Sequence, residues 1–409
     1  MDRIKESLKN RRFVFWEEIA RDGAQAKTIL SGKQRAEIAN LHSQIFNQNG
    51  SDHLVFAAGF VSIAPQEVDV IKEMADGVEN CYLAVNCRSV KDEIKASFEA
   101  IKKAKYPRVA FVLPASERLS EVMLHKSVEE VFEYGLDIGK YALDNSNGIP
   151  VDLQLAAAYD GNPAQIAEFG EKMTELGIAT IGLGDTRGRI YPYEIKNFYE
   201  TLLNNCSKDV LIAPHLHNDL GFALENTLVG LRQGITFACS SWLGLAERNG
   251  LVPTELLTFL LSYQNGNTIE RLGFDGSSLF LTEPNLKLLR PIAKKISEFT
   301  GRPLLVTDPI VGTGVNTIST GTPFVDTHSF QPFDPKEILG VEKEVFVTQL
   351  ANRRVIIECG NKLGFSFEEE NIKQILKIIK EIAYKTNRSI VPENELIELF
   401  EKFGQKHNK

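Results

Sequence analysis

Two histidines stand two positions apart in PHLHNDLGF, residues 214–222, directly after the apolar run DVLIA. Side chains two positions apart on a β-strand point to the same side, so His215 and His217 are expected to face one common point where a strand ends. Paired imidazoles suit a divalent ion such as Zn²⁺ or Mn²⁺. On its own the pattern is more often a matter of packing or hydrogen bonding than of metal binding, so a metal site needs a further ligand.

Asp22 is the candidate for that third ligand. It follows the apolar run FVFWEEIA in the segment ARDGAQ, which also contains Arg21 and Gln25. One carboxylate and two imidazoles leave coordination positions free for water or substrate, and such an ion can polarise a carbonyl group. Mg²⁺ would need more oxygen ligands.

Short apolar runs alternate with longer helical patterns between about residues 13 and 265. The runs are nearly continuous, as expected for parallel strands covered on both faces. They are FVFWEEIA, HLVFAAGF, CYLAVN, RVAFVL, VDLQLAAA, ATIGLG, VLIAPHLH and TFACSSW. About eight strand–helix units in about 250 residues predict a (β/α)8 TIM barrel, with a doubly wound sheet as the alternative. Neither GxGxxG nor GxxxxGK[ST] follows the first run, which disfavours a nucleotide-binding fold.

Polar residues follow several of the predicted strands, where the catalytic groups of a barrel lie. Asp185 and Thr186 follow the sixth run, Asn218 follows the seventh, and Glu247 follows the eighth in GLAERNG. Asp185 and Thr186 could equally cap the next helix.

The barrel pattern stops near residue 265, which predicts a catalytic domain over 1–265 and a linker with a helical subdomain over 266–409. The second part holds a Gly/Thr/Pro-rich segment, VGTGVNTISTGTPFVDTHSFQPFDP, and the amphipathic stretch EENIKQILKIIKEIAYKT. A long irregular segment of this kind is often functional. We therefore expect a TIM barrel with a smaller α-rich C-terminal extension.

The composition narrows the function class. The 409 residues carry a net charge of −8 with no clustered basic segment, which disfavours nucleic-acid partners. No apolar stretch reaches the length of about 20 residues that spans a membrane, and the N-terminus lacks a secretory apolar region. The five cysteines form no CxxC pair, so disulfides are not expected. These features predict a reduced, cytoplasmic protein that acts on small molecules.

Four motifs in this order, RDGAQ, LGDTRG, PHLHNDLGFALENTLVGLRQGI and GLAERNG, resemble the DRE-TIM metallolyase superfamily. That group includes 2-isopropylmalate, homocitrate and citramalate synthases and 3-hydroxy-3-methylglutaryl-CoA (HMG-CoA) lyase. The resemblance covers the whole predicted barrel. It implies that Asp22, His215 and His217 hold a divalent metal ion, either Zn²⁺, Mn²⁺ or Mg²⁺.

The resemblance also implies roles for the residues around the metal. Arg21 is expected to face the substrate carbonyl and to stabilise its enolate-like oxygen. The motifs imply that Gln25 and Glu247 are catalytic groups and that Asp185, Thr186 and Asn218 bind substrate. His328 lies outside the motifs and is a candidate catalytic group, with a surface histidine as the alternative.

Most features of the sequence resemble the synthases. GLAERNG and the segment PIVGTGVNTISTGTPF are similar to synthase motifs, whereas LGDT and PASERLSEVMLHKSVEE are similar to the lyases. The synthase reading implies a homodimer that condenses an acyl-CoA, acetyl-CoA first, with a 2-oxo acid and releases CoA. A carbon–carbon lyase and a divergent member without catalysis remain alternatives. Tyr159, Phe56 and Leu113 are candidates for selecting the 2-oxo acid side chain.

Several positions depart from the synthase pattern. Ile318 and Pro323 stand where synthases carry histidines in H-E-S-G-x-H, which leaves His328 as the candidate base. Leu251 stands where an asparagine ligand is expected, with Asn249 close by.

The strands carrying the site also depart from the pattern. Phe56 replaces a usual glutamate, and Glu17 in WEEIARDG takes the acidic place before the arginine. The metal site is thus expected to persist while the reaction partner changes.

Overall fold

The computed structural model describes residues 2–26, 28–263, 268–271, 273, 279–320 and 330–406. Their contacts group the chain into two compact units, Met1–Pro303 and Leu304–Lys409. The domain boundary expected between residues 265 and 266 lies outside the described residues.

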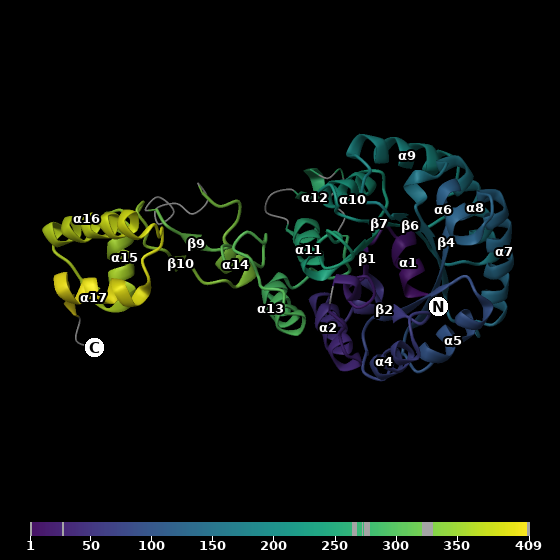
Figure 1. Cartoon of the computed structure of the whole chain (residues 1–409), viewed down its shortest axis with the longest axis horizontal. Coiled ribbons are helices and arrows are strands. Elements are labelled where there is room, and N and C mark those ends of the chain that lie inside the picture. Colours follow the sequence, from purple (N-terminus) through teal and green to yellow (C-terminus); the bar gives the residue numbers. More distant parts are fainter. Residues whose placement is uncertain are drawn as a thin grey trace. The chain divides into compact units, whose positions relative to one another are not determined.

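The first unit is built on parallel strands that follow the predicted apolar runs. The strands are β1 Val14–Glu17, β2 Leu54–Phe60, β3 Tyr82–Arg88, β4 Pro107–Pro114, β5 Val151–Ala156, β6 Ile181–Asp185, β7 Ile212–Leu216 and β8 Phe237–Ser240. They pair in the order β7-β6-β5-β4-β3-β2-β1-β8, and β7 and β8 lie next to each other. The sheet therefore forms a nearly closed barrel, which confirms the predicted fold class (Figure 1).

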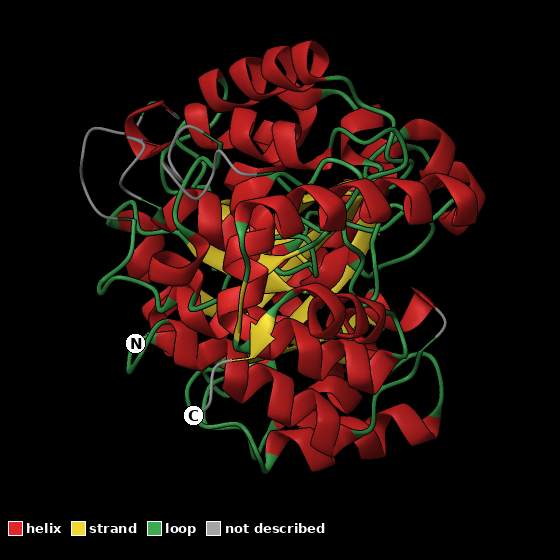
Figure 2. Cartoon of the chain, turned by 90° about the vertical axis from the view of Figure 1, so that its left-hand side faces the viewer, coloured by secondary structure: helices red, strands yellow, loops and turns green. Residues whose placement is uncertain are grey.

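Helices surround this barrel, and its strands lie among them in Figure 2. The helices of the first unit are α1 Arg3–Lys9, α2 Gly32–Ile45, α3 Gly50–His53, α4 Pro65–Ala75, α5 Lys91–Ile101, α6 Glu117–Leu124, α7 Val128–Asp144, α8 Pro163–Leu176, α9 Pro192–Asn204, α10 Ala223–Arg232, α11 Thr254–Ser262, α12 Thr268–Arg271 and α13 Leu289–Thr300. Local sequence fixes several starts: Ser31 and Ser127 begin α2 and α7 with capping boxes, in which Gln34 and Glu130 bond back to the cap.

The barrel interior is filled from one end by α1. Ile4 and Leu8 of this helix belong to the same buried cluster as Trp16 and Phe237 on β1 and β8. In Figure 1 the helix overlies the strands inside the ring of outer helices. The short amphipathic N-terminal segment therefore closes the end of the barrel where the strands begin.

The second unit is mainly helical, as expected for the extension. Its elements are β9 Thr317–Ile318, α14 Pro335–Leu339, β10 Glu344–Val345, α15 Arg353–Leu363, β11 Phe365–Ser366, α16 Glu369–Thr386, α17 Glu393–Phe403 and β12 Gln405–Lys406. Val355, Ile375, Ile379 and Phe400 form the fully buried centre of its core. Among the residues described in both units, no helix combines the length and the apolar character needed to cross a membrane.

Candidate metal centre

The turn after β1 and the end of β7 bring Asp22, His215 and His217 together. The carbonyl oxygen of Glu18 accepts hydrogen bonds from the backbone N–H groups of residues 21, 22 and 23, which turns the chain sharply after the strand. The Nε2 atoms of His215 and His217 lie 3.2 and 3.8 Å from Oδ2 of Asp22. One ligand atom from each side chain lies within 4.8 Å of the others. This spacing allows the three residues to share one cation.

The hydrogen bonds around Asp22 suit a metal ligand. Its Oδ1 accepts a hydrogen bond from the backbone N–H of Glu247 at 3.0 Å and one from Nε2 of Gln25 at 3.3 Å. Oδ2 is the oxygen that faces both imidazoles. Within the described residues, Nδ1 of His217 is buried without a hydrogen-bond partner. One oriented carboxylate and two imidazoles fit a divalent cation such as Zn²⁺ or Mn²⁺.

Glu18 supports the site from behind His215. Its Oε1 lies 3.4 Å from Nδ1 of His215, so the two ring nitrogens of this histidine face Glu18 and Asp22 respectively. Glu18 also accepts two hydrogen bonds from the Arg21 guanidinium, both at 2.7 Å. A carboxylate behind a histidine ligand fixes the orientation of the ring and increases its basicity. Cys239 on β8 completes this buried group around His215.

The electrostatics of the cluster favour ionised Asp22 and neutral His217, the forms that a cation requires, whereas without a metal ion they favour the charged form of His215. Burial opposes ionisation of Asp22, but the charges of Arg21 and His215 outweigh it and hold the pKa of the carboxyl well below its usual range. Burial also opposes the charged form of His215, yet the hydrogen bond to Asp22 helps to raise its pKa well above the usual value. Burial, reinforced by His215, lowers the pKa of His217 to about 4. The site thus contains a carboxylate beside at least one neutral imidazole.

The remaining residues predicted as catalytic groups lie in different places. Arg21 is next to the cluster, with Nη2 3.4 Å from Oδ2 of Asp22. Glu247 approaches Asp22 through its backbone, whereas its side chain pairs with Arg248 at 3.0 Å and is half exposed. His328 lies outside the described residues.

The predicted substrate-binding side chains hold the loops around the site. Oδ2 of Asp185 accepts a hydrogen bond from the N–H of residue 190 at 3.1 Å, and Oγ1 of Thr186 accepts one from Ala157 at 2.7 Å. Oδ1 of Asn218 accepts one from Ala223 at the start of α10, at 3.2 Å. Their contact with substrate stays a prediction.

The positions that depart from the synthase pattern are also visible. Ile318 is buried in β9, and Pro323 lies outside the described residues. Leu251 is buried and apolar, so it supplies no ligand atom. Nδ2 of Asn249 lies 3.5 Å from the carbonyl oxygen of Asp219.

The acidic residue that pairs with Arg21 is Glu18, whereas the side chain of Glu17, at the acidic position of the pattern, lies on the other side of β1. Val14 and Trp16 face the barrel interior, so the alternation of a strand continues inward to Glu18 and directs Glu17 outward. There Oε1 of Glu17 accepts a hydrogen bond from the Trp242 N–H at 3.0 Å, on the helix side of β1. The alternation along β1 was the signal that could have identified Glu18.

The three residues suggested for side-chain selectivity also face the helices. Phe56 alternates with inward Val55 and Ala57. The hydroxyl groups of Tyr159 and Tyr199 of α9 are hydrogen-bonded at 2.7 Å.

Leu113 has the same orientation. Its side chain packs against Gly135 of α7, where an added Cβ would lie 2.6 Å from Leu113 Cδ1. The side chains of Phe56 and Leu113 therefore point away from the barrel mouth, and the selectivity role of Tyr159 stays a prediction.

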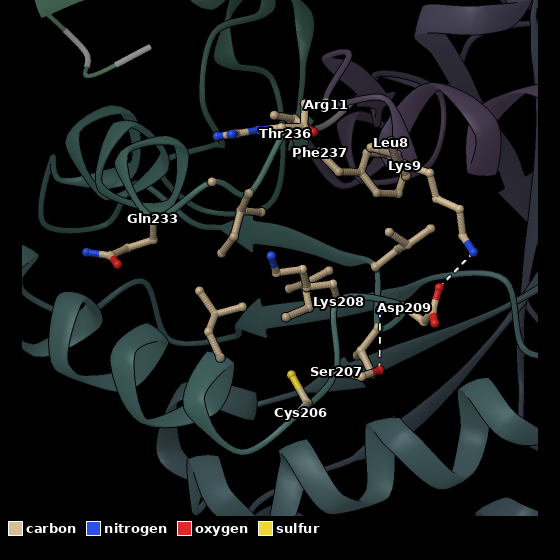
Figure 3. A pocket seen from close by; sticks show the side chains of 16 residues that line it. Leu8, Lys9, Arg11, Cys206, Ser207, Lys208, Asp209, Gln233, Thr236 and Phe237 are labelled. Carbon is tan, nitrogen blue, oxygen red and sulfur yellow. Dashed lines mark hydrogen bonds and ion pairs between the residues drawn. The ribbon is translucent and has the colours of Figure 1, made fainter. Parts of the chain in front are cut away.

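A cavity of about 670 Å³ opens at the other end of β7 and β8, where these strands begin (Figure 3). Lys9, Lys208 and Cys206 are among its lining residues. Lys9 forms an ion pair with Asp209 at its edge, at 2.7 Å. The three candidate metal ligands are not part of this lining.

Comparison with known families gives one matching model. The model described as HMGL-like matches residues 13–281, which include the whole barrel and all three candidate ligands.

Curated relatives match over nearly the whole chain. A 2-isopropylmalate synthase of Dictyoglomus turgidum is 25% identical, over 91% of this chain and 72% of its own length. Methylthioalkylmalate synthase 3 of Arabidopsis thaliana is 25% identical, over 94% and 78%. A homocitrate synthase of Methanocaldococcus jannaschii is 24% identical, over 95% and 90%.

Solved structures of similar fold include two HMG-CoA lyases. The Brucella melitensis lyase is 22% identical and has a TM-score of 0.55, covering 71% of this chain and 99% of its own. The Bacillus subtilis lyase is 20% identical with a TM-score of 0.55, covering 72% and 95%. At this identity the likeness shows the barrel fold alone.

Proposed function

This chain belongs to the HMGL-like family, and on that premise we propose that it is a metal-dependent acyltransferase. The reaction joins an acyl-CoA, with acetyl-CoA as the first candidate, to a 2-oxo acid. The products are a 2-hydroxy dicarboxylic or tricarboxylic acid and CoA. The convergence of Asp22, His215 and His217 on one point is the observation that carries the proposal. The relatives named as synthases along most of the chain favour condensation as the direction.

The residues around the candidate metal ligands suit the activation of a keto group. A divalent cation held by Asp22, His215 and His217 would supply Lewis-acid polarisation of the keto oxygen. Arg21 adds a fixed positive charge there, because its two hydrogen bonds to Glu18 hold the guanidinium beside Asp22. Charge that is oriented in advance stabilises an alkoxide as it develops, without a cost of reorganisation.

The condensation requires three changes in bonding. A base removes a proton from the methyl group of the acyl-CoA, and the resulting carbanion forms a carbon–carbon bond to the keto carbon as the keto C=O π bond opens to an alkoxide, which takes up a proton. Water then hydrolyses the thioester and releases CoA as the free thiol. We assign the proton removal to His328, because Ile318 cannot act as a base, and this assignment stays a prediction.

Cleavage is the second candidate function. Ile318 is an apolar residue at a place where the synthases carry a histidine, and the stretches LGDT and PASERLSEVMLHKSVEE resemble the lyases. The same ligands and Arg21 would then hold a hydroxy acid while its carbon–carbon bond breaks. A divergent member without catalysis is the remaining alternative.

A thiol-release assay separates these functions. Acetyl-CoA and propionyl-CoA are each incubated with pyruvate, 2-oxoisovalerate, 2-oxoglutarate, oxaloacetate or glyoxylate, in the presence of Mn²⁺, Zn²⁺ or Mg²⁺. We expect CoA release that depends on both the 2-oxo acid and the metal, and that Asp22→Ala abolishes. Asp209→Ala, at the far end of the barrel, is the matched control and retains the release.

Each alternative predicts its own outcome, and the lyase is tested with a separate substrate, because its cleavage releases no free thiol. Cleavage of a 3-hydroxy acyl-CoA without any condensation supports the lyase. Metal binding without turnover in either direction contradicts an enzymatic function. A second measurement, the mass of the native protein in solution, tests the predicted homodimer.

A further inference from the structure

Four inward side chains form one layer of the barrel at the level of the candidate metal ligands. In a (β/α)8 barrel, inward residues of alternate strands share layers, and the layer shifts by about one residue per strand. Trp16 of β1 pairs with Val55, and Val55 with Tyr82 of β3. Glu18 lies two positions beyond Trp16. The layer shift adds two further residues over the two strands, so the residue of β3 in the layer of Glu18 lies four positions beyond Tyr82 and is Asn86.

The same step of two residues continues around the barrel. It leads from Asn86 to Gln154 on β5 and from Gln154 to His215 on β7. Asn86 pairs with Ala110 and Ala110 with Asp152, two positions before Gln154. Gln154 pairs with Gly182 and Gly182 with Ala213, two positions before His215. Asn86 and Gln154 thus lie in one layer with Glu18 and His215.

The two amides of this layer differ from the two charged residues in their hydrogen bonding. Glu18 and His215 face each other at 3.4 Å. By contrast, Oδ1 of Asn86 and Nε2 of Gln154 are buried, and neither has a hydrogen-bond partner within the described part of the chain. A buried polar atom without a partner costs about 1–3 kcal/mol, so native proteins rarely retain one without a reason.

The packing around Gln154 shows that its position is specified. A Cβ added to Gly182 on β6 would lie 1.7 Å from Oε1 of Gln154, so the amide occupies space that the glycine leaves open. Ala57 and Ala110 are small inward residues on the intervening strands β2 and β4.

The two buried arginines nearby are already paired with acidic residues and do not satisfy the two amides. Arg108, the buried cation below this layer, donates hydrogen bonds to Asp152 and Asp2. Arg21, above it, is held by Glu18. Within the described residues, no partner in the barrel satisfies the open amide atoms, so a molecule that enters from the mouth is the natural partner.

We propose that Asn86 and Gln154 bind the side chain of the 2-oxo acid, and that this side chain carries a hydrogen-bonding oxygen. The inference rests on the proposed function and names the substrate class of that site. A hydroxyl group would donate to Oδ1 of Asn86 and accept from Nε2 of Gln154, and a carboxylate would accept from Nε2 of Gln154, whereas an aliphatic side chain would leave both amide atoms buried and unpaired. Sites built to bond a polar group reject analogues that lack it.

The test uses pairs of 2-oxo acids with equal size and shape. 2-Oxoglutarate is compared with 2-oxo-5-methylhexanoate, and 4-hydroxy-2-oxobutanoate with 2-oxopentanoate, in the metal-loaded protein. For at least one pair we expect kcat/KM for thiol release to favour the oxygen-bearing acid by about tenfold or more. Gln154→Met and Asn86→Leu should each reduce that preference by about tenfold, because kcat/KM falls for the oxygen-bearing acid.

A matched control separates this effect from general damage to the fold. Asn226 on α10 also has a buried Oδ1 without a partner among the described residues, but it bonds the carbonyl oxygen of Ile190 in the helical layer. Asn226→Leu should leave the preference between paired acids unchanged. If Asn86→Leu does not fold, Gln154→Met alone decides the outcome.

Binding provides a readout that does not depend on turnover. The oxygen-bearing acid should raise the melting temperature of the metal-loaded protein more than its aliphatic partner does, and Gln154→Met should remove this difference. A preference for the aliphatic acids, or equal losses for both members of each pair, overturns the inference. Absence of thiol release with selective binding intact contradicts the proposed function and leaves the inference standing.

Discussion

The two ends of the barrel interior both bury charged side chains, but they satisfy them differently. Where the strands begin, Arg108 donates two hydrogen bonds to Asp152, at 2.8 and 2.7 Å, and two more to Asp2, at 2.8 and 2.9 Å. Where the strands end, Asp22 faces two histidines, and Nδ1 of His217 is buried without a partner in the described structure.

This difference distinguishes the buried polar groups that stabilise the fold from those that are available to bind ligands. On β5 alone, Asp152 accepts hydrogen bonds from Arg108 and Thr180, while Gln154, two residues further on, has an open amide nitrogen. Both side chains face inward. At the closed end the chain itself satisfies Arg108 and its two acidic partners, and the open end retains unpaired atoms that molecules entering the barrel can bond.

The largest expected effect is a loss of unfolding free energy on replacing Arg108, at the end of the barrel where the strands begin. Arg108→Met leaves Asp152 and Asp2 without their cation, and breaking a buried pair in this way costs about 3–5 kcal/mol of unfolding free energy. Urea unfolding measures this loss, and metal affinity of the folded protein should not change. Adding Asp152→Asn should recover part of the stability. A loss of metal affinity in Arg108→Met would break the comparison between the ends.

Glu17, a buried acid on the outer face of β1, provides a second test, through the pH dependence of stability. Burial raises the pKa of Glu17 to about 8, from an ordinary value of 4.5. Between these values the folded protein retains a proton that the unfolded chain releases, so raising the pH lowers the stability. We expect this group to cost up to about 4 kcal/mol of unfolding free energy between about pH 5 and 8.

Glu17→Gln should remove this pH dependence, because an amide does not titrate. The measurement is urea unfolding of both proteins at several pH values in this range. Parallel stability curves for wild type and variant would show that Glu17 is ionised in the folded protein.

A smaller effect tests the open end. Glu18→Gln weakens the support behind His215, and loss of such a partner reduces metal affinity by about 10–100-fold. Titration calorimetry with Zn²⁺ or Mn²⁺ measures the change. Glu17→Gln is the matched control, because Glu17 faces the helices and its replacement should leave the affinity unaltered. Equal affinities in wild type and Glu18→Gln would contradict the supporting role.

The smallest effect concerns a half-exposed pair at the closed end. Arg3 pairs with Asp52 at 2.5 Å, and its side chain is 42% exposed. Solvent screens such pairs, so Arg3→Met should lower the unfolding free energy by less than about 1 kcal/mol. The same urea titration compares it directly with Arg108→Met. A loss as large as that of Arg108→Met would show that burial does not separate the two arginines.

Much of this architecture followed from patterns in the sequence. The eight apolar runs corresponded to the barrel strands, because continuous apolar segments between amphipathic ones can only be buried on both faces. The spacing of His215 and His217 and the position of Asp22 were sufficient to predict one cluster. The role of α1 was not predicted, because an amphipathic segment does not indicate which surface it will cover.

The sequence by itself determined the order of strands and helices and the types of residue that follow each strand. The tertiary structure decided which of those residues meet. Alternation along β1 chose Glu18 over Glu17, and the shear of the barrel placed Asn86 and Gln154 beside His215 although they come from three different strands. Such contacts depend on strand register around a closed sheet, and register is set by packing over the whole barrel and not by any single segment.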